Sequence, residues 1–213
     1  MGKQFHPSHM LFSYRDIGEQ SRTYLENWFK KKETLKPLFD LYFGVLHNKQ
    51  TYLDHKLLSL VQALESYHRR VFKTTETSKE EHEARLQEIF DATPEKHRSW
   101  LQRKLKHSNE LSLQNRLIEL VDVYKELLCN FIQKPGEFTQ QIADNRNYLT
   151  HYDPRLTSRA IRDSELYAVT EKLKVLVELF LLRELGVDDA SIKKIIEKRI
   201  RNILELLNGP DSF

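Results

Sequence analysis

The sequence has little glycine, little proline and a single cysteine. Glycine and proline each occur six times in 213 residues. This shortage counts against all-β and α/β folds, which need turn residues at the end of every strand. The single cysteine, Cys129, excludes an intrachain disulfide and a cysteine-based zinc site. We expect a buried thiol, because Leu127, Leu128 and Phe131 surround it in the sequence.

Long apolar runs are also missing, and the charges nearly balance. The richest stretch, 175–182, is interrupted by Glu178 and is far too short to span a membrane. The start of the chain, Met1 to Met10, lacks the basic-then-apolar order of a signal peptide, so we expect a cytoplasmic protein without a membrane partner. A net charge of +3 permits nucleic-acid binding but does not argue for it, because such partners are indicated by where charges cluster.

Apolar residues recur instead at three- and four-residue steps, which is the periodicity of helices. Long stripes of this kind cover 53–71, 113–131, 166–180 and 192–207. Each stripe is wide enough to face a shared core. The sequence therefore predicts an all-α protein, a helical bundle with additional short helices.

Shorter helices are expected over 21–32, 36–46 and 94–106. Ser78 and Glu81 form the pattern of a capping box at a helix start, and Gly186 stands where a helix end needs a left-handed residue. We expect three parts along the chain: an N-terminal arm with a short helix over 1–34, one helical domain over 35–208, and a C-terminal tail over 209–213.

One segment, 144–154, differs from its surroundings in holding an arginine, a histidine and two aspartates close together. Its helix must end near His151, because Pro154 disfavours helical geometry at Asp153. On an ideal helix, residues five apart differ by about 140° in direction and about 7.5 Å in rise, so Arg146 and His151 would not point together. A helix end relaxes this restriction.

Arginine and histidine in this segment suit the cleavage of phosphodiester bonds in RNA. A neutral histidine can take the proton of a ribose 2′-hydroxyl or protonate the departing 5′ oxygen. Arginine offers the phosphate oxygens a permanent, bidentate charge in the transition state. That scheme needs no metal and no cofactor. The alternative is structural: Arg146 pairs with Asp144 or Asp153 at the surface, and His151 caps the helix end.

The signature from Arg146 to His151 resembles that of HEPN domains, all-helical modules that include many metal-independent endoribonucleases. Three segments in order, 57–70, 111–117 and 144–153, are similar to the Apea-type HEPN domain of bacterial anti-phage proteins, and the similarity extends roughly from Leu35 to Leu207. The resemblance implies a HEPN-type bundle and a homodimer, in which two motifs face each other and form one RNA-cleaving cleft.

Carried onto this chain, the resemblance gives Arg146 and His151 the catalytic positions and Asn147 the polar position after the arginine. It implies an R-x4-H endoribonuclease that leaves a 2′,3′-cyclic phosphate, acting in anti-phage defence or toxin-like growth arrest. The other interpretation is a non-catalytic HEPN module for dimerisation or RNA binding. Apea-type domains usually follow a larger N-terminal region, whereas about 35 residues precede the similarity here. Either the chain stands alone or it belongs to a longer protein, with a sensor domain upstream or a regulatory partner.

Glu65 and His68 form a second candidate pair, three residues apart on a helix. This is the spacing of a di-iron ligand pair, but the further ligands of such a site are missing, so metal binding is not expected. The pair is either a half-buried acid and histidine at the edge of the core, or Glu65 orients Arg146 or His151, as acidic residues on the neighbouring helix do in the HEPN enzymes that the chain resembles.

Basic residues could hold the RNA. Arg155, Arg159 and Arg162 directly follow the motif and would lie near its mouth, which makes them the expected phosphate contacts. Two further clusters, 96–106 around Trp100 and 193–201, either bind RNA or form the solvated faces of amphipathic helices.

Overall fold

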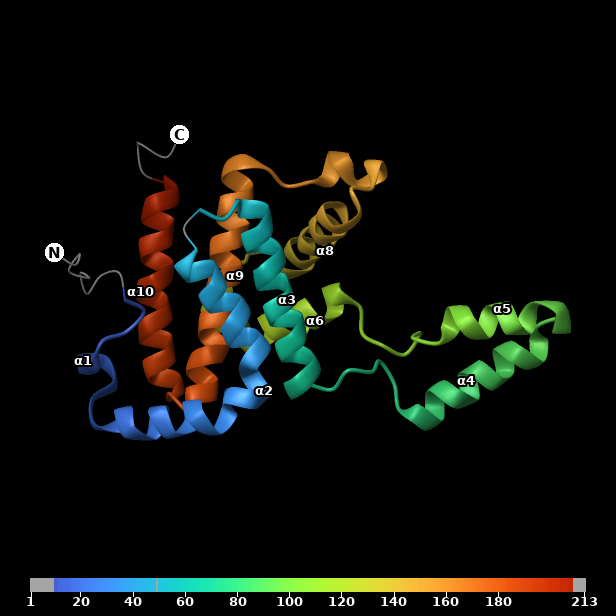
Figure 1. Cartoon of the computed structure of the whole chain (residues 1–213), viewed down its shortest axis with the longest axis horizontal. Coiled ribbons are helices and arrows are strands. Elements are labelled where there is room, and N and C mark those ends of the chain that lie inside the picture. The colour runs from blue at the N-terminus through green and yellow to red at the C-terminus, as the bar shows by residue number, and fades with distance from the viewer. Residues whose placement is uncertain (1–9, 49, 209–213) are drawn as a thin grey trace.

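The computed structural model describes residues 10–48 and 50–208, and in these residues it confirms the expected all-α fold (Figure 1). The elements in chain order, with η denoting 3-10 helices, are α1 (Tyr14–Ile17), η2 (Gly18–Gln20), α2 (Ser21–His47), α3 (Leu53–Val71), α4 (Lys79–Ala92), α5 (Glu95–Leu105), α6 (Leu113–Val123), α7 (Lys125–Leu128), α8 (Pro135–His151), η3 (Pro154–Arg159), α9 (Asp163–Leu185) and α10 (Asp189–Asn208). Within the described part, no helix is long and apolar enough to cross a membrane.

Some expectations concern residues outside the described ranges. Residues 1–9, which carry most of the signal-peptide argument, are among them, and so is the proposed tail, 209–213. The division into an N-terminal segment (1–34), a helical domain (35–208) and a tail (209–213) stays a prediction. Helix α2 runs without interruption across its first boundary, between positions 34 and 35.

The helices expected over 21–32 and 36–46 form one element, α2, which is sharply bent (Figure 1). The rings of Trp28 and Phe39 stack with centroids 4.1 Å apart, whereas a straight helix would separate residues eleven apart by about 16 Å along its axis. The bend has an identifiable cause in Pro37, which lies inside the helix and cannot donate the backbone hydrogen bond to the preceding turn. The two halves of α2, before and after Pro37, therefore pack against each other.

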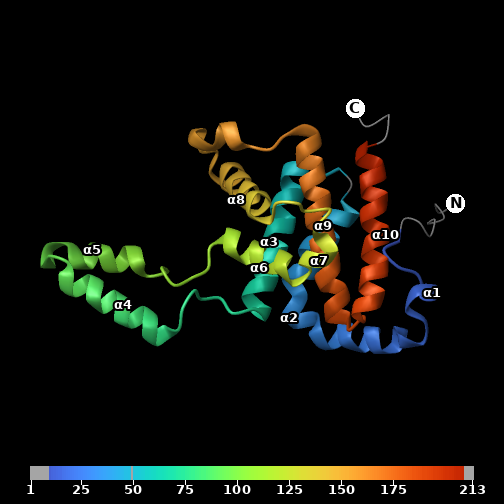
Figure 2. The same cartoon turned by 180° about the vertical axis from the view of Figure 1, so that it is seen from behind.

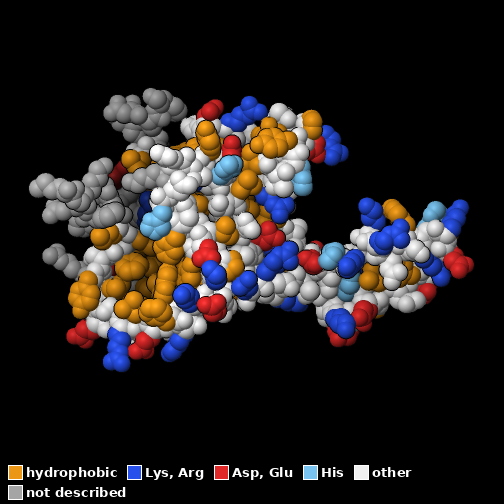
Figure 3. Space-filling model, viewed as in Figure 1, with side chains coloured by type: hydrophobic (Ala, Val, Ile, Leu, Met, Phe, Trp, Pro, Cys, Tyr) orange, Lys and Arg blue, Asp and Glu red, His pale blue; other side chains and the backbone are white. Residues whose placement is uncertain are grey.

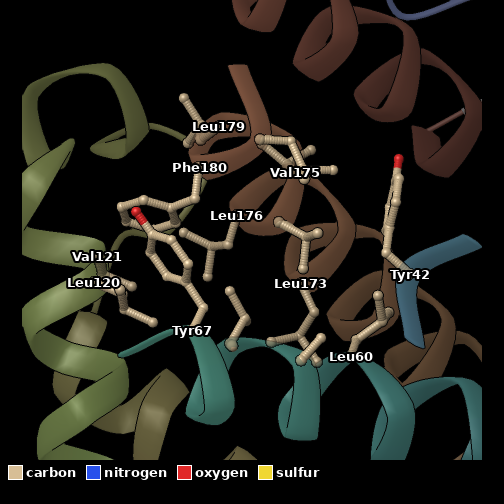
Figure 4. Packing of buried hydrophobic residues seen from close by; sticks show 14 of the residues in the cluster. Tyr42, Leu60, Tyr67, Leu120, Val121, Leu173, Val175, Leu176, Leu179 and Phe180 are labelled. Atoms are coloured by element: carbon tan, nitrogen blue, oxygen red, sulfur yellow. The ribbon is translucent and has the colours of Figure 1, made fainter. Parts of the chain in front are cut away.

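Helix α9 is the central element of the bundle and contacts α2, α3 and α10. Every residue from Val175 to Leu182 is buried, including Glu178. The apolar stripe predicted over 166–180 is therefore too narrow, because α9 is surrounded by other helices in this part. Figure 4 shows its residues packed against Leu60 and Tyr67 of α3 and Leu120 and Val121 of α6.

The carboxylate of Glu178 is compensated inside this core. It accepts hydrogen bonds from the hydroxyl of Tyr42 on α2, at 2.8 Å, and from Nε of Arg199 on α10, at 3.2 Å. Burial beside this carboxylate raises the pKa of Tyr42 far above its ordinary value, so the hydroxyl remains a donor. Arg199 also donates to Glu171, which lies two turns earlier on the same face of α9. These bonds connect α2, α9 and α10.

Helices α4 and α5 form a hairpin that projects from the bundle, and we call it the arm (Figures 1 and 2). Neither helix contains a buried residue. The arm is joined to the bundle by a short stalk, in which Thr75 and Glu110 form an antiparallel bridge. The side chain of Asn109 strengthens this stalk, since its Oδ1 accepts from the backbone N–H of Thr77 at 3.0 Å and its Nδ2 donates to the carbonyl of Thr77 at 3.2 Å.

Ser78 and Gly186 mark helix ends as expected, with only the Ser78 half of the capping box formed, whereas the prediction for Cys129 is wrong. Ser78 accepts from the backbone N–H of Glu81 at the start of α4, and Gly186 has a φ of 85° at the end of α9. Cys129 is exposed. The stripe expected over 113–131 is divided between α6 and α7, and α7 ends at the buried Leu128. The next residue, Cys129, therefore faces solvent, with its Sγ donating to the carbonyl of Glu126 at 3.2 Å.

Candidate functional site

The motif lies on the last turns of α8, whose final residue is His151, as the sequence predicts. Tyr152 follows in the left-handed region, with a φ of 49°, and its N–H donates to the carbonyl of Tyr148. Asp153 then caps η3 by accepting from the backbone N–H of Arg155 at 3.0 Å. The chain thus reverses immediately after His151 and leaves the helix end open.

Arg146 is held by Glu65 of α3. Its Nη2 lies 3.6 Å from Oε2 of Glu65, and its Nη1 donates to Oδ1 of Asn147 at 3.1 Å. The side chain of Arg146 is 35% exposed and that of Glu65 is 20% exposed, so the pair lies at the surface of the α3–α8 contact. Two roles were considered for Glu65: an acid at the edge of the core, or an acid that orients Arg146 or His151. Its contact with Arg146 agrees with the second role.

The structural alternative, in which Arg146 pairs with Asp144 or Asp153, is wrong in its choice of partners. Asp144 lies 3.3 Å from Nη1 of Arg159, and Asp153 binds the guanidinium of Arg155, with one Nη2 contact of 2.7 Å. The side-chain hydrogen bonds from Arg155 make the largest contribution to lowering the pKa of Asp153, to about 2. The acids of the motif are thus occupied by the arginines that follow it.

The imidazole of His151 is exposed at the helix end and forms no hydrogen bond or ion pair within the described ranges, although it lies near enough to Asp153 to contribute to the lowered pKa of that carboxyl. No hydrogen bond joins it to Arg146. This agrees with the different directions that an ideal helix gives to residues five apart. The imidazole is therefore accessible to a ligand or to another chain.

The three arginines expected to contact RNA differ in their surroundings. Arg155 and Arg159 are exposed but engaged with Asp153 and Asp144. Arg162 is exposed at the start of α9 and forms no ion pair among the described residues. Their contact with RNA stays a prediction.

Sequence reasoning did not find a row of charges that continues from Arg146. Oε1 of Glu65 accepts from Nε of Arg69 at 3.2 Å and from its Nη2 at 3.1 Å. Nη1 of Arg69 donates to Glu110 at 3.2 Å, and Glu110 lies at the base of the arm beside His107. The spacing of Glu65 and Arg69, four residues apart on a predicted helix, was the available signal.

His68 does not lie at the edge of the core, because its side chain is completely buried against Phe72. Its Nδ1 lies 3.2 Å from Nη1 of Arg116, and its Nε2 lies 2.7 Å from Oε2 of Glu119. Arginine can only donate, so Nδ1 must accept and Nε2 must carry the proton given to Glu119. Burial lowers the pKa of His68 and outweighs the opposing effect of Glu119. His68 is therefore a neutral structural residue.

Arg116 is itself completely buried, and its Nε and Nη2 have no hydrogen-bond partner among the described residues. Its position could have been noticed in the sequence, since a charged residue stands between Leu113, Leu117 and Leu120 on one apolar helix face. In the described part of the chain, no group of three or more His, Cys, Asp or Glu side chains could hold a metal ion.

Residues 58–191 match the protein family described as Apea-like HEPN, which is more than half of the chain. The chain belongs to the Apea-like HEPN family. The resemblance inferred from the sequence is thereby confirmed, and the matched range lies within the expected one, roughly 35–207. No curated protein and no solved structure matches the chain.

The site of this Apea-like HEPN chain is contained in the matched residues. They include Glu65 on α3 together with Arg146 and His151 on α8, and the whole arm. Membership of the family supports a nuclease-like domain of the kind that binds RNA and dimerises.

Proposed function

We propose that this Apea-like HEPN chain is a metal-independent endoribonuclease. The observation that carries the proposal is the arrangement at the end of α8. Arg146 lies against Glu65 of α3, whereas the imidazole of His151 is exposed and forms no hydrogen bond or ion pair among the described residues. An arginine fixed for phosphate and a histidine free for proton transfer are the groups that cleavage of RNA by its own 2′-hydroxyl requires.

In the proposed reaction, the ribose 2′ oxygen attacks the adjacent phosphorus, and the bond from phosphorus to the 5′ oxygen breaks. One histidine takes the proton of the 2′-hydroxyl, and an acid gives a proton to the departing 5′ oxygen. Arg146 binds the phosphate oxygens while negative charge grows on them. The products are a 2′,3′-cyclic phosphate and a 5′-hydroxyl, and no metal or cofactor takes part.

A homodimer would complete this site. One chain supplies a single exposed histidine at this helix end, and that histidine is not hydrogen-bonded to Arg146. If two α8 ends face each other across a two-fold axis, the second chain brings another Arg146 and another His151. His151 of one chain then acts beside Arg146 of the other on the same phosphate, and the exposed position of His151 permits this approach.

RNA cleavage by such an enzyme would act on the cell that makes it. We therefore place the protein in anti-phage defence, where it arrests growth as a toxin does, under the control of a sensor domain or a regulatory partner. Arg155, Arg159 and Arg162 are assigned to the RNA at the mouth of the site. RNA would compete with Asp153 and Asp144 for the first two of them, because a phosphate and a carboxylate bind guanidinium in the same way.

The test uses total RNA, an excess of EDTA, the purified chain and its Arg146→Ala and His151→Ala variants. The proposal expects cleavage by the wild type and a loss of at least about a hundredfold in each variant, which is typical of a lost acid-base or charge-stabilising group. Both positions are partly or fully exposed, so neither change should unfold the chain. Cleavage that is undiminished in both variants would remove these residues from the site.

The second candidate is a non-catalytic HEPN module that dimerises or binds RNA. One observation favours it, since Arg146 is already paired with Glu65 and does not meet His151 in a single chain. The same assay separates the candidates. The non-catalytic module would bind RNA and leave it intact in every variant, also after dimerisation has been verified by sedimentation.

A further inference from the structure

The arm is a projecting part of the described chain that the proposed site does not use. Its two helices have no buried residue, and its direction is set by the stalk of Thr75, Glu110 and Asn109. Figures 1 and 2 show that it projects on the same side of the bundle as the end of α8 and η3. A molecule bound at His151 could therefore extend toward the arm.

The two helices of the arm carry opposite charge. Helix α4 has five acidic and two basic residues, whereas α5 has four basic residues and one acidic residue. The basic residues of α4 are paired on their own helix, Lys79 with Glu83 and Arg85 with Glu81. On α5, by contrast, none of the four cations, Lys96, Arg98, Arg103 and Lys104, forms an ion pair in the described part of the chain, and Arg98 donates to the carbonyl of Thr93 at 3.0 Å. The positive charge of α5 is thus left uncompensated.

An exposed indole lies among these cations. Trp100 is 54% exposed, although Leu101 and Leu105 of the same helix are half-buried and supply the apolar contacts within the arm. Lys96 precedes Trp100 by four residues, and Arg103 and Lys104 follow it by three and four. Residues at these spacings share one face of a helix. We call this face the Trp100 face. It places an accessible indole between cations on the preceding and the following helical turn.

The basic helix is the one nearer the proposed site. In Figure 1, α5 lies on the side of the arm that is closer to η3 and the end of α8, and α4 lies on the far side; the reverse view in Figure 2 agrees. Figure 3 shows the molecule hollowed between the arm and the bundle, with Lys and Arg side chains gathered on the side of the arm that borders this hollow. Negative charge on α4 is kept away from it.

We propose that the Trp100 face binds single-stranded RNA and holds it beside the α8 site. The indole would stack on one unpaired base, and Lys96, Arg103 and Lys104 would bind the neighbouring phosphates, a combination that suits single strands of any sequence. Paired bases would not expose the ring faces that stacking needs. The proposal rests on the proposed function, because the RNA held by the arm would be the substrate of the endoribonuclease site. RNA binding by the arm is nevertheless measurable without cleavage.

The experiment measures binding of a fluorescein-labelled oligouridine of about 20 nucleotides to the full chain carrying His151→Ala, which leaves the RNA uncut. In that background, the three cations are replaced together (K96Q, R103Q, K104Q), and Trp100→Ala is tested separately. The matched control removes the same charge from exposed positions in the first half of α2, at a distance from the arm (R22Q, K30Q, K32Q) (Figure 1).

The triple arm variant should weaken binding at least about tenfold and lower the slope of log K against log salt by about 2, since each phosphate contact of a single strand contributes about 0.7. Trp100→Ala should weaken binding about tenfold and leave the slope unchanged, because stacking releases no counterions. The α2 control should bind within about twofold of the parent. Circular dichroism verifies that all variants remain helical.

Binding by both arm variants that equals binding by the α2 control would overturn the proposal. It would also be overturned if the arm variants kept RNA binding but changed the sedimentation of the chain, because the opposite charges of α4 and α5 would then serve contact between two copies. Failure of the proposed function is a separate result. If the wild type cuts no RNA while the arm variants lose binding, the arm proposal stands and the catalytic assignment does not.

Discussion

Nη2 of Arg146 lies 3.6 Å from the carboxylate of Glu65, across the contact between α8 and α3. The same carboxylate also binds Arg69, which in turn binds Glu110 at the base of the arm. The candidate catalytic arginine is therefore one end of a row of alternating charges that leads to the arm. In such a row, each charge limits the positions of its neighbours, and we propose that Glu65 directs Arg146 rather than acting on RNA itself.

Glu65→Gln should lower the rate of RNA cleavage about tenfold, which corresponds to about 1.4 kcal/mol of activation free energy. The amide keeps the size of the side chain but no longer attracts Arg146. Single-turnover kinetics should show the loss in kcat, with RNA affinity retained. The control is Arg69→Gln, which leaves the contact between Glu65 and Arg146 in place and should cost less than about threefold. Full activity of Glu65→Gln would refute the positioning role.

His68→Leu should lower the free energy of unfolding by about 3 kcal/mol, because it leaves the buried Arg116 without its hydrogen-bonded partner. The double variant His68→Leu, Arg116→Met removes the charge as well. It should regain at least about 1 kcal/mol relative to the single variant, since apolar groups of similar volume replace a buried polar pair well. Denaturant titrations of the four proteins measure this cycle, and strictly additive losses would contradict the coupling.

The stability of the protein should fall between pH 7 and pH 5, partly through His68. Burial lowers the pKa of His68, so the folded chain binds this proton less readily than the unfolded chain does. Its contribution is present above the unfolded pKa of about 6.5 and is lost as the pH falls through the lower folded pKa. Thermal unfolding at several pH values should give a smaller slope for His68→Leu than for the wild type. Equal slopes would show that His68 does not titrate in this range.

Mixing two inactive variants should restore part of the activity. In freely exchanging dimers of Arg146→Ala and His151→Ala, roughly half of the dimers would be mixed. Each mixed dimer keeps one Arg146 and one His151, on different chains, so recovery indicates a shared cleft. Mixtures that stay as inactive as either variant, although exchange is verified by labelled chains, would indicate that each chain needs its own complete pair.

Much of the fold follows from helical periodicity alone. The apolar stripes predicted a helical bundle because burial on one helix face repeats every three to four residues. Ser78 and Gly186 mark helix ends through local hydrogen bonds and backbone geometry. What periodicity could not give depends on tertiary contacts. The bend that stacks Trp28 on Phe39, the burial of α9 on all sides and the exposure of Cys129 are decided by where the helices meet.

The candidate site was predictable to a similar extent. The segment around Arg146 and His151 was recognisable because its residue types and its helix end are local features. The partner of Arg146 was less certain, since Asp144 and Asp153 are nearer in sequence than Glu65. Arg155 and Arg159 take those aspartates instead, and only the packing of α3 on α8 brings Glu65 to Arg146.

The most direct test of the central claim is the chemistry of the RNA ends. A defined single-stranded RNA is incubated with the wild-type chain in EDTA, and the termini are analysed by mass spectrometry. If His151 and Arg146 promote attack by the 2′-hydroxyl, the fragments carry a 2′,3′-cyclic phosphate and a 5′-hydroxyl, and a 2′-deoxy nucleotide at the cut position prevents cleavage. Fragments with a 3′-hydroxyl and a 5′-phosphate, or cleavage that survives the 2′-deoxy substitution, would contradict the account.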